Sequence, residues 1–151
     1  MGKVFEDELM DLHSEYISLC LETVPNADKI YVYCSIEEAS SMFNAFFEVN
    51  KEVKTLGKLG VDRSTTMQLL ATGTRTLERY EELGKRCGRP VPTEIRMIYN
   101  VHAKKLDTQY RYDEICSSDS DVCAEDVFMN WYSEVQKNNR GFGRKSGRVS
   151  G

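Results

Sequence analysis

The sequence has few of the residues that usually carry catalytic or metal-binding chemistry. Its 151 residues include two histidines, His13 and His102, and one tryptophan, Trp131. Neither histidine has a second histidine or a cysteine at the spacing of a metal site, and no close pair of cysteines occurs. The glycines match no phosphate-binding pattern. We therefore expect no metal and no cofactor.

Long apolar runs are also missing, and the N-terminus is acidic rather than basic. These absences argue against a membrane span and a signal peptide, so the sequence predicts a cytoplasmic protein. The odd number of cysteines, five, argues against a disulfide framework. Cys116 and Cys123 flank the polar segment Ser117–Asp121. We expect two reduced thiols there, with a disulfide under oxidation as the alternative.

Charge is unevenly distributed along the chain. The formal net charge is −4, but residues 140–151 hold four basic residues and no acidic one. Without them, 16 basic residues stand against 24 acidic ones, a net charge of −8. An acidic body disfavours direct binding to nucleic acid and favours a basic partner protein. The sequence thus predicts one domain, residues 1–139, followed by a basic, glycine-rich, flexible tail, residues 140–151.

Hydrophobic periodicity predicts alternating hairpins and helices. The expected helices are 4–23, 62–85 and 124–138, and the expected strands are 29–35, 41–50, 94–99 and 104–112, with a further short strand possible at 53–56. The order α-β-β-α-β-β-α is typical of an α+β domain, in which two hairpins build an antiparallel sheet and the helices pack on one of its faces. His13 lies beside Asp11 and Glu15, so we expect it to be solvated.

Three segments carry a resemblance to a known family. They read KIYVYCSIEEASSMFNAFF, PTEIRMIYNVHAKKLDTQYRYD and DVFMNWYSEV. Together, over residues 5–136, they resemble the YezG-like immunity/antitoxin family, with Ala27 and Asp28 standing where a tryptophan would be expected. The matching positions are Ile30, Tyr31, Tyr33, Pro92, Glu94, Ile95, Tyr99, Tyr112, Asp113, Phe128 and Trp131.

The resemblance implies a non-catalytic, cytosolic protein that binds and neutralises a cognate secreted toxin domain, often a nuclease. An acidic inhibitor can cover the basic surface with which a nuclease grips phosphate. We therefore predict an interface that combines carboxylates with tyrosine anchors. The candidates are Glu37, Glu38, Asp113, Glu114, Asp119, Asp121, Glu125 and Asp126, with Tyr31, Tyr33 and Tyr110.

Two other functions fit the sequence. One is a non-catalytic adaptor or secretion chaperone for another partner protein. The other is an enzyme whose site the motifs do not reveal, for example a Cys34–His102 nucleophile pair. The sequence gives no indication of the oligomeric state.

Overall fold

A computed structural model describes residues 5–37, 40–113 and 123–150 of the chain. The elements are α1 (Phe5–Thr23), β1 (Lys29–Glu37), β2 (Ser40–Val49), β3 (Glu52–Thr55), α2 (Arg63–Cys87), β4 (Glu94–Asn100), β5 (Lys105–Arg111) and α3 (Ala124–Ser150). The strands form one antiparallel sheet in the order β3-β2-β1-β4-β5. The predicted α+β class is thus confirmed.

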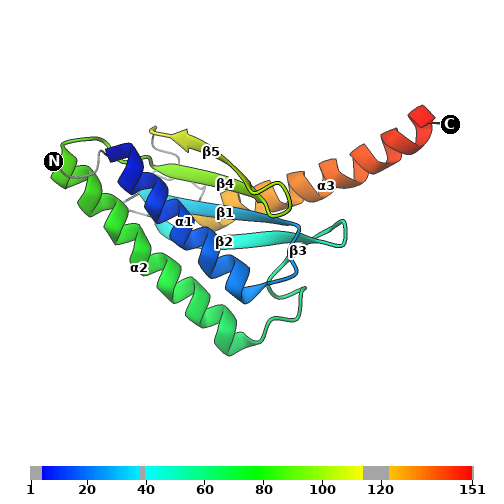
Figure 1. The fold of residues 1–151 in the computed structure, drawn as a ribbon, viewed down its shortest axis with the longest axis horizontal. Helices are drawn as coiled ribbons and strands as arrows, with labels where there is room; N and C mark the ends of the chain where they lie inside the picture. The colour runs from blue at the N-terminus through cyan, green and yellow to red at the C-terminus, as the bar shows by residue number, and fades with distance from the viewer. Residues whose placement is uncertain (1–4, 38–39, 114–122, 151) are drawn as a thin grey trace.

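The helices lie on both faces of the sheet, which differs from the single covered face that the sequence predicted (Figure 1). Helices α1 and α2 pack side by side on one face, and α3 packs on the other. The reason is visible in β1, whose side chains are buried on both faces from Ile30 to Glu37. A strand that is apolar on both faces needs a covering layer on each side.

The larger core lies between the sheet and the pair α1–α2. On the sheet side it contains alternate residues of β1 and β2, such as Ile30, Val32 and Phe47, which are all fully buried. Helix α1 contributes Tyr16 and Cys20 to this core. Burial raises the pKa of the Cys20 thiol to about 12, so this cysteine packs as a small apolar side chain.

The smaller core lies beneath α3. Phe46 of β2 makes edge contacts with the rings of Phe128, Trp131 and Tyr132, at centroid distances of 5.8, 5.0 and 5.2 Å. Tyr31 of β1 stacks on Phe46 at 4.6 Å. These aromatic contacts fix the first turns of α3 on the sheet.

Helix α2 has a defined start and end. Asp62 is the N-cap, and its carboxylate accepts a hydrogen bond from the Thr65 backbone N–H. Gly88 ends the helix in the left-handed conformation, with φ of 63°.

In the middle of α2, Gly73 lies against Phe43 of β2 so closely that a Cβ atom would stand 2.2 Å from the Phe43 ring. The glycine therefore allows α2 to approach the sheet.

Two elements differ from their predicted bounds. Strand β3 follows β2 through a two-residue turn, Asn50-Lys51, in which both residues have positive φ, 51° and 69°. This is the geometry of a type I′ hairpin turn, and no glycine marks it in the sequence.

Helix α3 continues to Ser150, where the sequence predicted a flexible tail from residue 140. Extending an existing helix needs no new nucleation, which makes this continuation less costly than a new helix.

Candidate partner-binding surface

The outer side of α1 is acidic along its whole length. This helix contains no lysine or arginine, and its exposed acidic residues include Asp7, Asp11, Glu15 and Glu22. Their spacing places these four side chains on one side of the helix, over roughly 22 Å at 1.5 Å per residue. We call these four residues the acidic stripe. The sequence signal was present in the helical spacing, but the predicted interface did not include it.

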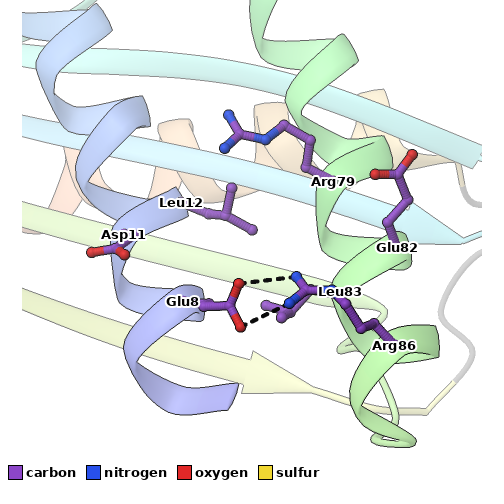
Figure 2. Close-up of a pocket in the computed structure, with 7 residues that line it drawn as sticks. All are labelled: Glu8, Asp11, Leu12, Arg79, Glu82, Leu83 and Arg86. Atoms are coloured by element: carbon purple, nitrogen blue, oxygen red, sulfur yellow. Dashed lines mark hydrogen bonds and ion pairs between the residues drawn. The ribbon is translucent and has the colours of Figure 1, made fainter. Parts of the chain in front are cut away.

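The acidic stripe borders a groove between α1 and α2 (Figure 2). Buried Leu12 and Leu83 lie among the residues that line it. Glu8 and Arg86 point toward each other across the groove and form two hydrogen bonds of 3.0 and 3.1 Å. Asp11, in contrast, points away from Arg86 in this view. The ion pair therefore closes this part of the groove with the protein's own side chains.

Two further ion pairs join α1 to the region of α2. Arg79 donates to Glu15 at 2.6 Å, and Arg89 lies 3.3 Å from Glu6. The bond to Glu15 raises the pKa of Arg79. Since all these side chains are largely exposed except Glu8, the pairs add orientation more than stability. These pairs connect the two helices across the groove.

His13 is fully buried, so the prediction that it is solvated was wrong. Its Nδ1 atom lies 2.7 Å from the Tyr80 hydroxyl and its Nε2 atom lies 2.9 Å from the Tyr110 hydroxyl. Burial lowers the pKa of His13 to about 4, which keeps the imidazole neutral. Since both ring nitrogens are bonded to tyrosines, the arrangement is that of a satisfied core histidine.

Glu94 is a second buried polar side chain, with 2% of its surface exposed. Its two carboxylate oxygens accept hydrogen bonds from the Tyr33 hydroxyl at 3.0 Å and from Arg96 Nε at 3.1 Å. The Arg96 guanidinium in turn lies over the Trp131 ring, 5.1 Å from its centroid. This chain of contacts links β1, β4 and α3, and it gives Glu94 a structural role.

Several predicted interface residues are buried and thus cannot present their side chains to a partner in this structure. Tyr31, Tyr33 and Glu37 have exposed fractions of 6, 1 and 6%. The tyrosines face α3, which the prediction of a single covered face left out. Tyr110 is only half-buried, but its hydroxyl is bonded to His13. The proposed tyrosine anchors are therefore corrected to core and packing residues.

The predicted interface residues from Asp113 to Asp126, here called the acidic segment, are described only at the two ends of this range. Asp113 is exposed and pairs with Arg111 at 3.0 Å, and this contact lowers the pKa of the Asp113 carboxyl. Asp126 accepts a hydrogen bond from the Cys123 backbone N–H at 3.3 Å, which caps the start of α3. Glu125 is exposed in the same turn. The remaining members of the segment and of the prediction lie outside the described residues: Glu38, Glu114, Asp119, Asp121 and, of the cysteine pair, Cys116.

The predicted alternative nucleophile pair is not formed. Cys34 is fully buried in β1, opposite Ile95. His102 lies in the turn after β4, where its Nε2 atom is 2.7 Å from Asp28. Because Asn100 pairs with Lys29 at the other end of β1, the two side chains lie at opposite ends of the strand pair.

Within residues 5–37, 40–113 and 123–150, no group of three or more His, Cys, Asp or Glu side chains is placed to hold a metal ion. In the same part of the chain, no helix has both the length and the apolar character that a membrane span requires. No protein-family model matches the sequence, and no curated protein matches it significantly.

Proposed function

We propose that this protein is an immunity protein, or antitoxin, that binds a cognate secreted toxin domain and blocks it by covering a basic surface. The toxin class that best fits is a nuclease. The observation that supports this proposal is the acidic stripe of Asp7, Asp11, Glu15 and Glu22 on a helix without any basic residue. The family resemblance of the sequence supplies the biological setting.

The acidic stripe is unfavourable for the isolated protein. Carboxylates four residues apart, as in the pairs Asp7–Asp11 and Asp11–Glu15, repel each other on a helix surface. Arg79 of α2 offsets part of this repulsion at Glu15. A basic partner would offset more of it, because the partner's lysine and arginine side chains would pair with these carboxylates. Nucleic-acid phosphates, which are negatively charged, would be repelled by the same carboxylates.

Such a surface also fits the kinetics that an antitoxin needs. A toxin must be captured before it acts, and complementary charge raises association rates in a way that falls with ionic strength. Nuclease surfaces that grip phosphate carry the opposite charge. The acidic stripe would then occupy the nucleic-acid site and exclude the substrate directly.

The test is co-expression with the toxin domain encoded beside this protein, scored by growth and by isolation of a complex. The informative variant is Asp7→Lys/Glu22→Lys, because neither residue forms a salt bridge with another described residue. We expect this variant to fold normally and to bind the toxin at least about tenfold more weakly, with a shallower salt dependence.

Two matched controls separate the possible interfaces. Glu134→Lys changes an exposed carboxylate on α3, away from α1, and should leave protection intact. Glu125→Lys probes the acidic segment that the sequence predicted. If only this second control weakens binding, the interface belongs to that segment and not to α1. If a complex forms but toxicity persists, the protein is an adaptor or chaperone and the proposal fails.

A further inference from the structure

Strand β5 forms one edge of the sheet, because the strand order ends with it and it pairs only with β4 among the described strands. An edge strand presents backbone N–H and C=O groups that can pair with another strand. The possible pairings depend on which backbone groups of β5 point away from β4. The hydrogen bonds at the two ends of β4 determine which residues of β5 these are.

Odd-numbered residues of the β4 region bond to β1. The Val101 N–H donates to the Asp28 carbonyl at 3.0 Å, and the Ile36 N–H donates to the Thr93 carbonyl at 2.9 Å. Because bonded pairs alternate in an antiparallel ladder, the even-numbered residues of β4 bond to β5. Their β5 partners are odd-numbered, as in the pair Arg96–Gln109. The even-numbered residues of β5 therefore direct their backbone groups to the open edge: Leu106, Thr108 and Tyr110.

This alternation restricts how β5 could pair with a copy of itself. In a two-fold antiparallel arrangement, outward-bonding residues must face outward-bonding residues. With the axis at Gln109, Thr108 faces the partner's Tyr110, which satisfies this condition. The same register places Asp107 opposite the partner's Arg111, and it does so twice because of the symmetry. Asp107 and Arg111 are both exposed.

The next pairs in this register are also complementary. If the extended backbone continues past Arg111, the last residue of β5, Leu106 stands opposite the partner's Tyr112 and Lys105 opposite the partner's Asp113. Tyr112 is one of the exposed large hydrophobic residues, with 56% of its surface accessible. Opposite charges and apolar side chains in facing positions both stabilise an antiparallel pair.

The neighbouring registers that satisfy the same backbone condition are unfavourable. An axis at Thr108 places Lys105 opposite the partner's Arg111. This register brings like charges into facing positions, which is destabilising. An axis at Tyr110 leaves only residues 109–111 of the two strands facing each other, so Asp107 has no facing residue in β5. Charge on an edge strand often prevents pairing, but here its order favours the axis at Gln109 over the two neighbouring axes.

We propose that β5 pairs antiparallel with β5 of a second copy about a two-fold axis at Gln109, so that two sheets become one continuous sheet. This dimer rests on the edge strand alone and is independent of the proposed toxin binding. The partner is a second copy because Asp107 and Arg111 of this strand complement each other twice in this register.

The first test uses charge exchange and measures mass in solution by light scattering and sedimentation over a range of concentrations. The wild type should form a dimer. Asp107→Arg and Arg111→Asp should each weaken it by about tenfold or more, because each creates facing like charges. The double variant Asp107→Arg/Arg111→Asp exchanges the charges and should restore the dimer. Glu81→Arg reverses an exposed charge on α2 and should have no effect.

The second test checks the register by oxidative cross-linking in a Cys116→Ser/Cys123→Ser background. Gln109→Cys places its thiol beside its own copy on the axis, at a spacing that a disulfide can bridge, and should form a covalent dimer. Thr108→Cys should not, because it faces Tyr110 of the partner subunit. A monomeric wild type, or a double variant that stays dissociated, would overturn the proposal. A dimer that cross-links through position 108 would overturn the register.

Discussion

Nδ1 of His13 on α1 lies 2.7 Å from the hydroxyl oxygen of Tyr80 on α2, and both side chains are buried. Burial lowers the pKa of His13 from 6.5 to about 4 in the folded protein. Between these two values the unfolded chain binds a proton that the folded protein does not. The free energy of unfolding should therefore fall as the pH drops from 6.5 to 4, by about 3 kcal/mol from this residue alone.

His13→Gln tests this relation, because glutamine keeps a donor and an acceptor but does not titrate. Urea unfolding at several pH values should show a flatter profile for this variant between pH 6.5 and 4. His102→Gln removes an exposed histidine and serves as the control. Equal pH profiles for the wild type and His13→Gln would contradict a neutral, buried His13.

Gly73 and Phe43 define a second prediction. Alanine is favoured over glycine in a helix by about 1 kcal/mol, so Gly73→Ala should stabilise α2 if propensity decided the outcome. The added Cβ would instead stand 2.2 Å from the Phe43 ring, and overpacking of this kind costs roughly 1–3 kcal/mol. We expect a net loss in the free energy of unfolding. Gly57→Ala has nothing within 4 Å of its Cβ and should be neutral or slightly stabilising.

The sequence predicted most elements because their signals are local. Strands β1 and β2 are rich in aromatic and β-branched residues, and Asp62 and Gly88 bound α2 through caps that depend only on neighbouring backbone. The turn at Asn50-Lys51 was missed because it reaches positive φ without glycine. Strand β3 was therefore predicted only as a possibility.

His13 shows where reasoning from sequence failed and where it could have succeeded. Its neighbours Asp11 and Glu15 are two residues away, which on a helix is the opposite side. The steps from Leu9 to His13 and then to Tyr16 follow the buried stripe, so helical spacing did indicate burial. Its hydrogen-bond partners come from α2 and β5, and no local pattern could have revealed them.

Trp131 is predicted to be the residue that holds α3 on the sheet. It contacts Phe46, Tyr31 and the Arg96 guanidinium, and only 6% of its surface is exposed. Trp131→Ala should cost roughly 3–5 kcal/mol in the free energy of unfolding, as measured by circular dichroism in urea. Met129→Ala changes an exposed side chain of the same helix and should have little effect. A small effect of Trp131→Ala would mean that α3 does not depend on this contact.

The Tyr33 hydroxyl and the Glu94 carboxylate give the last prediction. The hydroxyl donates to Glu94 Oε2 at 3.0 Å in a buried site, and Arg96 occupies the other oxygen. Tyr33→Phe leaves the ring in place but removes one donor from a buried carboxylate, which should cost about 1.5–3 kcal/mol. Tyr31→Phe, two residues away on the same face of β1, is the matched control. Among the described residues no hydrogen bond joins the Tyr31 hydroxyl, so we expect a change below about 0.5 kcal/mol.

A double-mutant cycle separates this contact from general effects of the hydroxyl. Tyr33→Phe and Glu94→Gln should be less than additive, because each removes part of the same hydrogen bond. The free energies come from urea unfolding of the wild type, both single variants and the double variant at neutral pH. Strict additivity would show that the two groups do not interact in solution. The Tyr33 hydroxyl would then add nothing to the backbone pairing of β1 with β4 and to the packing beneath α3.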